Sequence, residues 1–182
     1  MSLRAGRFLS LLAALVLLAA LTASSAAPAQ ELGVRWGPVL SQVTPTSAVV
    51  AWAMTEPARC RVLCDGREFR SPQHKIFHTV KLDGLAPATD HEYYVEAFAG
   101  EKRAATDHFV FRTPPTQMPA WSFLVFGDTR SDHPAHKKVI DAVLRVTPRP
   151  WLAINTGDLV SDGRKAELWD MFFRIEEPLV GT

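Results

Sequence analysis

Apolar and polar residues alternate along most of the segment between residues 33 and 113. In TSAVVAWAM, Val50 and Trp52 fall on one face of a strand, and in HEYYVEAFAG the same spacing sets His91 and Tyr93 on one face. Turn residues separate such runs at short intervals, and no helical pattern interrupts them. We therefore predict an all-β antiparallel sandwich over residues 33–113.

The pattern changes after residue 120. Two continuous apolar runs, 121–126 and 151–156, are each followed by a segment with helical spacing. The apolar helical stripes are Val139, Ile140, Val143 and Leu144 in the first segment, and Leu168, Trp169, Phe172 and Phe173 in the second. This β-α-β-α order predicts two parallel strands with crossover helices. The continuous apolar run 121–126 is typical of a strand buried on both faces. The proline-rich residues 114–119 between the two patterns predict a semi-rigid linker.

The first 29 residues have the organisation of a secretory signal peptide. Arg4 and Arg7 precede an apolar run, 8–21, and small residues follow it. That run is shorter than the roughly 20 residues that span a bilayer, although an uncleaved anchor is the alternative. We expect an exported protein, periplasmic or extracellular, with no stable membrane anchor.

Two cysteines, Cys60 and Cys64, lie on one face of a predicted strand. Their Cα atoms would be roughly 13 Å apart, whereas a disulfide needs less than about 7 Å. A disulfide would therefore require a sharp bend, and two buried thiols are favoured. A C-x-x-x-C pair alone offers too few ligands for zinc. The formal net charge of +1 argues against nucleic acid as the main partner.

Both apolar runs of the second segment end at a Gly-Asp pair. The carboxyl ends of neighbouring parallel strands lie about 4.8 Å apart, so Asp128 and Asp158 would converge there, with Gly127 and Gly157 allowing sharp turns. Two close carboxylates repel each other unless a proton or a cation lies between them. The pattern favours a two-metal centre that activates water. The alternative is that each aspartate caps the helix after it.

The stretches GDTRSDH and NTGDLVSDG resemble the first two motifs of the calcineurin-like metallophosphoesterases. VKLDGLAPATDHEYYVEA resembles the E–F corner of a fibronectin type III domain, with His91 where that family has a tyrosine, so we expect a looser corner. Together they look most like the purple acid phosphatase branch. The resemblance implies a multidomain protein: an all-β fibronectin III-like sandwich, then the first β-α-β-α portion (120–182) of an α/β metallophosphoesterase domain.

The resemblance also implies an activity and a metal centre. Asp128 would bind one metal and Asp158 would bridge two, as divalent or mixed-valence ions such as Fe, Zn or Mn. The implied reaction is hydrolysis of a small-molecule phosphomonoester or phosphodiester by metal-activated water. The alternative from another class is an exported binding or adhesion module with a non-catalytic second domain.

The sequence departs from the resembled families at two motif positions. Arg130 stands where many members have a histidine, and Ser161 stands where purple acid phosphatases have a tyrosine. Arginine stays protonated and is no ordinary metal ligand, so we expect Arg130 either to bind substrate phosphate or to pair with Asp132 or Asp162.

The sequence also predicts the places of two further histidines, and it lacks several motifs of the resembled family. His133 and His136 are expected at the surface, or near substrate. The Asn-His pair and the two later histidine segments of the resembled family do not occur in the 182 residues. We therefore expect this chain to be an incomplete part of a domain, with an exposed apolar patch and little activity alone.

Overall fold

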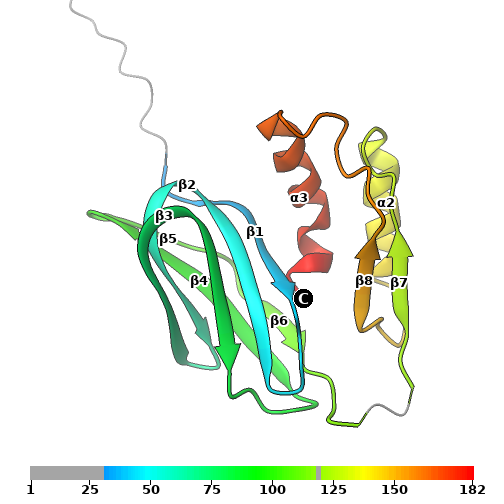
Figure 1. The fold of residues 1–182 in the computed structure, drawn as a ribbon, viewed down its shortest axis with the longest axis horizontal. Coiled ribbons are helices and arrows are strands. Elements are labelled where there is room, and N and C mark those ends of the chain that lie inside the picture. Colours follow the sequence, from blue (N-terminus) through cyan, green and yellow to red (C-terminus); the bar gives the residue numbers. More distant parts are fainter. Residues whose placement is uncertain (1–30, 118–119) are drawn as a thin grey trace, which may run out of the picture. The chain divides into compact units, whose positions relative to one another are not determined.

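Six antiparallel strands form the first part of the computed structural model, which describes residues 31–117 and 120–182. The predicted signal peptide lies outside the described residues. The strands are β1 (Val34–Ser41), β2 (Ser47–Cys64), β3 (Arg67–Asp83), β4 (Asp90–Ala99), β5 (Lys102–Ala105) and β6 (Phe109–Arg112) (Figure 1). Across 31–117 and 120–182, no helix has the length and apolar character to cross a membrane.

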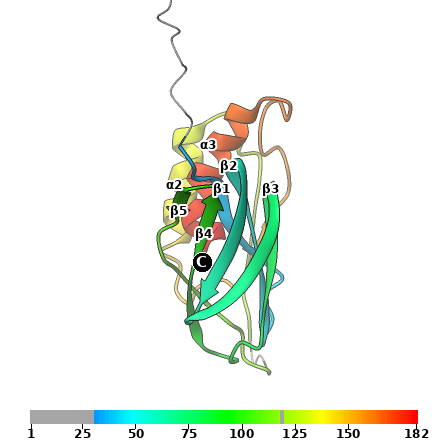
Figure 2. The same ribbon diagram turned by 90° about the vertical axis from the view of Figure 1, so that its left-hand side faces the viewer.

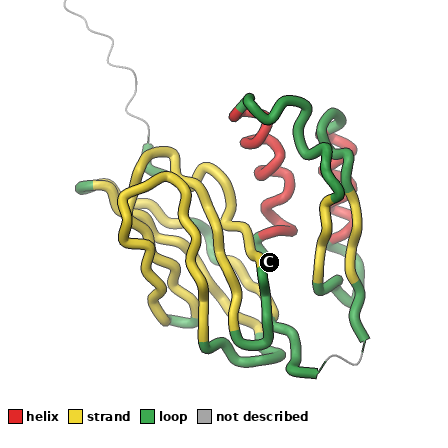
Figure 3. The backbone as a smooth tube through the Cα atoms, in the orientation of Figure 1, coloured by secondary structure: helices red, strands yellow, loops and turns green. Residues whose placement is uncertain are grey.

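The strands β2 and β3 form one long hairpin that folds over on itself. It runs from Ser47 paired with Asp83 to the turn at Asp65–Gly66, and its register shifts between Ala53 and Cys60. The first half of β2 also pairs with β1, and its second half pairs with β4. Both β5 and β6 pair with β4. The two halves of the hairpin thus contribute to two layers of a sandwich (Figures 2 and 3).

One apolar core fills the sandwich. It takes Val50 and Trp52 from the first half of β2 and Val62 and Cys64 from the second half, which shows that the two halves face a common interior. These are the inward positions that the alternation predicts. Both cysteines are buried and unbridged, as the strand spacing predicts.

The corner before β4 is held by His91, which is 2% exposed. Its Nε2 donates to the carbonyl oxygen of Ala86 (3.0 Å), and its Nδ1 lies 2.5 Å from a carboxylate oxygen of Asp65. Thr113 Oγ1 donates to the same Ala86 carbonyl (2.6 Å). The expectation of a looser corner is wrong, because the imidazole is bonded at both ring nitrogens.

A parallel strand pair and two helices follow, as the β-α-β-α pattern predicts. The elements are β7 (Phe123–Phe126), α2 (His133–Val143), β8 (Leu152–Asn155) and α3 (Ala166–Val180). The strands pair in parallel from Phe123 with Leu152 to Phe126 with Asn155. Helix α3 contains Pro178 in its last turn.

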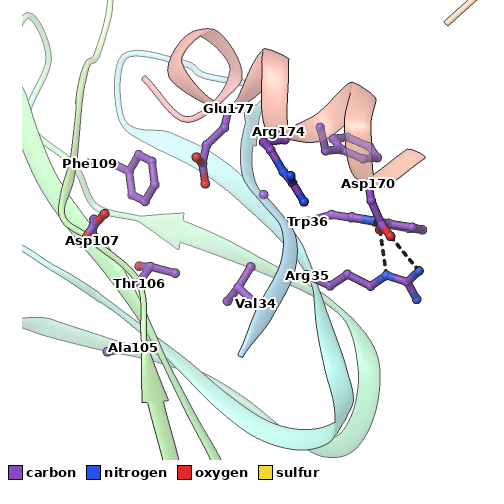
Figure 4. A pocket seen from close by; sticks show the side chains of 12 residues that line it. Val34, Arg35, Trp36, Ala105, Thr106, Asp107, Phe109, Asp170, Arg174 and Glu177 are labelled. Atoms are coloured by element: carbon purple, nitrogen blue, oxygen red, sulfur yellow. Dashed lines mark hydrogen bonds and ion pairs between the residues drawn. The ribbon is translucent and has the colours of Figure 1, made fainter. Parts of the chain in front are cut away.

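Helix α3 packs on β1 of the sandwich. Arg35 binds Asp170 through Nε and a terminal nitrogen (2.8 and 3.1 Å), and Trp36 stacks on Phe173 with ring centroids 5.4 Å apart. A cavity of about 580 Å³ lies beside these contacts, and Glu177 points into it (Figure 4). Burial, with a smaller contribution from the charge of Asp107, raises the pKa of Glu177. The pair and the stacked rings fix α3 against the sandwich.

One face of the β7–β8 pair is exposed. Its side chains, each 42 to 53% exposed, are Phe123, Val125, Leu152 and Ile154. On the other face, Leu124 lines a small cavity together with Val143 of α2 and Leu179 of α3. The expectation that strand 121–126 is buried on both faces is therefore wrong, because the helices cover only one side of a two-stranded sheet. The apolar patch was expected at the helical stripe of α3 instead, where Phe172 is buried and Leu168, Trp169 and Phe173 are partly buried.

Candidate metal site at the ends of β7 and β8

The carboxyl ends of β7 and β8 are in direct backbone contact. The amide of Asp128 donates to the carbonyl of Gly157 (3.0 Å), and the amide of Thr156 donates to the carbonyl of Phe126 (2.8 Å). A Cβ atom on Gly127 would lie 2.1 Å from Thr156 Oγ1. An alanine there would clash with the Thr156 side chain and lie 3.2 Å from the Thr156 amide nitrogen, so glycine suits the close approach of the two strand ends.

Asp128 and Asp158 both have left-handed backbone conformations, with φ of 55° and 53°. Such values are uncommon outside glycine, although aspartate adopts them more readily than most residues. Strained residues of this kind gather at functional sites, where the surrounding structure holds them in place. Sequence analysis found the two residues but not this shared conformation.

Neither aspartate caps a helix. The N-cap of α2 is Asp132, whose side chain accepts from the Ala135 amide (3.0 Å). The N-cap residue of α3 is Lys165, which makes no side-chain capping bond. The capping alternative for Asp128 and Asp158 is therefore wrong.

The guanidinium of Arg130 lies between the two aspartates. Its Nε is 3.5 Å from Asp128 Oδ1, and a terminal nitrogen is 3.2 Å from Asp158 Oδ2. The expected partners were Asp132, which caps α2, and Asp162, which instead binds Arg164 (3.0 Å). Arg130 thus offsets the repulsion between two carboxylates that the strand ends bring together. All three side chains are about half exposed or more, so each contact is modest in energy.

Three buried polar atoms around the strand ends have no hydrogen-bond partner within the described part of the chain. They are Thr129 Oγ1, His133 Nδ1 and Asn155 Nδ2. Most buried polar groups are paired, so each exception needs an explanation such as an ion or water. Sequence analysis considered His133 but missed Thr129 and Asn155. The available signal was their position, since Thr129 follows Asp128 directly and Asn155 ends β8.

His136 is buried between α2 and α3. Its Nε2 lies 2.7 Å from Glu176 Oε1, and both side chains are at most 2% exposed. Burial raises the pKa of Glu176, and the hydrogen bond from His136 partly opposes that shift. The expectation that His136 lies at the surface or near substrate is wrong, because it joins the two helices. Ser161 is exposed in the loop before α3.

The donor set at the strand ends fits a divalent cation. Asp128 and Asp158 present carboxylate oxygens with side chains 77% and 55% exposed, so a hydrated ion has access to both. Oxygen-rich sites suit Mg²⁺ or Mn²⁺, and a cation there would take the place that Arg130 holds.

Solved structures similar to this chain include a plant enzyme and several β-sandwich domains. A purple acid phosphatase from yellow lupin (Lupinus luteus) seeds superposes with a TM-score of 0.63 at 17% identity, over 80% of this chain and 33% of that one. The matched part of this chain is longer than the segment from β1 to β6, so the shared fold extends past the sandwich. This chain therefore spans about a third of the length of the lupin enzyme.

Several fibronectin III-like domains are also structural neighbours, at lower scores. The central fibronectin III array of RIM-binding protein gives a TM-score of 0.36 at 26% identity, over 46% of this chain and 32% of that one. Domains FN1–FN3 of chicken CNTN1 give 0.34 at 13% identity, over 54% and 38%. No protein-family profile matches the chain, and no curated protein matches it.

Proposed function

We propose that this chain is the metal-binding first part of an exported phosphoesterase domain. The observation that carries the proposal is the pair Asp128 and Asp158, both in left-handed conformations at neighbouring strand ends and both bound to one guanidinium. The fold likeness to a purple acid phosphatase supports the reaction class. The substrates would be phosphomonoesters or phosphodiesters of small molecules.

Each residue of the proposed site would have a separate role. Asp128 would hold one metal ion and Asp158 would bridge two. Bound metal supplies an activated water and neutralises charge on the phosphoryl oxygens. Arg130, released from the carboxylates when metal binds, would meet the phosphate through two parallel N–H donors. Its half-exposed position leaves it free to turn outward.

The two carboxylates are fewer ligands than a two-metal centre needs. The remaining ligands and the general acid would have to come from other residues of a full domain. We therefore expect weak metal binding by the 182-residue chain and little hydrolysis by it alone.

Calorimetric titration with Mn²⁺ tests the proposal directly. Asp158→Asn keeps a residue that tolerates the left-handed conformation while it removes the charge, and we expect it to abolish binding. Asp132→Asn is the matched control, because asparagine caps a helix as well as aspartate does and the nearby charge is still lost. Equal Mn²⁺ affinity in the wild-type chain and in Asp158→Asn would refute the metal site.

A binding or adhesion module is the second candidate. It is favoured by the exposed apolar face of β7–β8 and by a carboxylate pair that Arg130 already neutralises without metal. In that case Mn²⁺ would leave the thermal unfolding temperature unchanged. A rise in the unfolding temperature that Asp158→Asn abolishes would favour the phosphoesterase instead.

A further inference from the structure

The turn that closes the β2–β3 hairpin brings three metal-binding residue types together. A sulfur of Cys64, a carboxylate oxygen of Asp65 and a ring nitrogen of His91 lie within 4.8 Å of one another. Cys64 ends β2, Asp65 opens the Asp-Gly turn with φ of 49°, and His91 comes from β4. The sequence offered only the C-x-x-x-C pair, with too few ligands for zinc, because residues 64 and 91 become neighbours only through strand pairing.

Neighbouring backbone groups already orient two of these side chains. The carbonyl of Ala86 accepts from His91 Nε2 (3.0 Å), which leaves Nδ1 facing Asp65. The amide of Glu92 donates to the other oxygen of Asp65 (3.1 Å). Metal-binding histidines and carboxylates usually have outer partners of this kind, which fix the ring and the tautomer.

A nucleophilic role for Cys64 does not fit the geometry. The thiol is 1% exposed, and the histidine nitrogen that a thiol would need as its base is bonded to a carbonyl or faces a carboxylate. Burial and the charge of Asp65 raise the pKa of Cys64 to about 11, the opposite of an activated thiol.

We propose that Cys64, Asp65 and His91 form a binding site for a borderline-soft divalent cation such as Zn²⁺. The donor set of one sulfur, one nitrogen and one oxygen suits Zn²⁺ and excludes Mg²⁺ or Ca²⁺ as the preferred ion. The cation lies between His91 Nδ1 and Asp65 in place of the hydrogen bond that joins them, and the Cys64 thiol releases its proton to solvent so that the thiolate binds the cation. Its fourth position is held by water, which enters beside Asp65, whose side chain is 43% exposed.

This site is independent of the strand ends of β7 and β8. It belongs to the sandwich, its ligands include sulfur, and it would bind a different class of ion from the all-carboxylate pair at Asp128 and Asp158. A metal that binds there would link the hairpin turn to β4 and stabilise the sandwich.

Titration with Co²⁺, followed by absorption and then by displacement with Zn²⁺, tests the proposal. A cysteine ligand gives a sulfur-to-cobalt charge-transfer band in the near ultraviolet, which carboxylate sites do not give. We expect the band in the wild-type chain under reducing conditions and its loss when Zn²⁺ is added. Asp65→Asn is expected to weaken Co²⁺ binding by about tenfold or more.

The cysteine pair supplies the matched control. Cys64→Ser should remove the charge-transfer band, whereas Cys60→Ser should keep it, because Cys60 is equally buried but lies beside His78 instead. Circular dichroism confirms that each variant is folded. Absence of the band in the folded wild-type chain, or its persistence in Cys64→Ser, would overturn the proposal. A band that Asp158→Asn removes would also overturn it.

Discussion

Tyr93 of β4 donates a hydrogen bond through Oη to the carbonyl oxygen of Gly181, at 2.8 Å and 88 residues away in sequence. The hydroxyl is buried in the sandwich, and burial raises the pKa of Tyr93. Gly181, which supplies this carbonyl, is the C-cap residue of α3. This bond and the pair of Arg35 with Asp170 join the C-terminal helix to the sandwich at two separate points.

Substitution of Tyr93 by phenylalanine should destabilise the chain without disturbing ring packing. Phe109 and Phe111 keep their contacts with the ring, but the carbonyl of Gly181 loses its buried donor. We expect a loss of about 1–2 kcal/mol in the free energy of unfolding, measured with urea. Tyr94→Phe is the control, since that hydroxyl has no hydrogen bond within the described part of the chain and should change stability little. Equal effects of the two substitutions would show that the Gly181 bond is unimportant.

The alternation of the strands was sufficient to predict the sandwich because burial follows it directly. Trp52, His78 and Tyr93 are inward positions that two-residue spacing identifies without knowledge of the partner strand. The parallel β7–β8 pair and the approach of Asp128 to Asp158 were likewise predictable, since both follow from the order of the elements.

The contacts that depend on partners distant in sequence were not predictable. A continuous apolar run such as Phe123–Phe126 does not reveal whether a covering layer exists on both faces. For Arg130, the sequence left substrate phosphate, Asp132 and Asp162 open as partners. The guanidinium lies instead against Asp128 and Asp158, both in left-handed turns. His91 reached Asp65 only through the pairing of β2 with β4.

Acid should destabilise the chain through His78. Its ring is stacked on Trp52, and burial lowers its pKa from the ordinary 6.5. As the pH falls below about 6.5, the unfolded chain binds a proton that the folded chain does not, so the free energy of unfolding falls. Below the pKa of His78 in the folded chain, both states carry the proton, and the free energy of unfolding stops falling on account of this residue.

The measurement is urea unfolding at several pH values between 4 and 8. His78→Gln should reduce the pH slope below 6.5, although it also lowers stability by disturbing the core. His74→Gln is the control, because solvent surrounds His74. An unchanged slope in His78→Gln would show that His78 becomes charged in the folded chain as easily as in the unfolded one.

Removal of Arg130 should strengthen metal binding and weaken phosphate binding. In Arg130→Ala the two carboxylates lose the guanidinium that competes with a metal ion. We therefore expect Mn²⁺ affinity to rise by about tenfold, a change in binding free energy similar to the energy of two exposed ion pairs. Inorganic phosphate should bind the Mn²⁺-loaded variant less tightly than the loaded wild-type chain. Titration calorimetry measures both affinities, and Arg164→Ala provides an exposed arginine control. A fall in Mn²⁺ affinity would mean that Arg130 supports the metal site and does not compete for it.

The exposed face of β7–β8 should bind a hydrophobic dye. Val125 and Ile154 are paired across the two strands and half exposed, so replacing both with threonine removes apolar area while it keeps strand propensity. We expect weaker fluorescence of anilinonaphthalene sulfonate and a stability change within about 0.5 kcal/mol. Val139→Thr, an exposed position on α2, should leave the fluorescence unchanged. Equal fluorescence in the double variant would place the dye site elsewhere.

A methyl group at Gly127 should separate the strand ends and with them the two aspartates. In Gly127→Ala the new Cβ would meet Thr156 Oγ1 at 2.1 Å and the Thr156 amide nitrogen at 3.2 Å, so backbone has to move. Overpacking of this kind costs about 1–3 kcal/mol. Because Asp128 and Asp158 diverge, Mn²⁺ affinity should fall even though no ligand is changed.

The effect at Gly127 can be distinguished from a general intolerance of alanine. Gly163→Ala places its Cβ 3.9 Å from Trp169, an ordinary contact, and should alter neither stability nor Mn²⁺ affinity appreciably. Adding Thr156→Ala to Gly127→Ala removes the closest clash and should restore part of both quantities. If Gly127→Ala binds Mn²⁺ as well as the wild-type chain, the close approach of the two strand ends is not what positions the carboxylates.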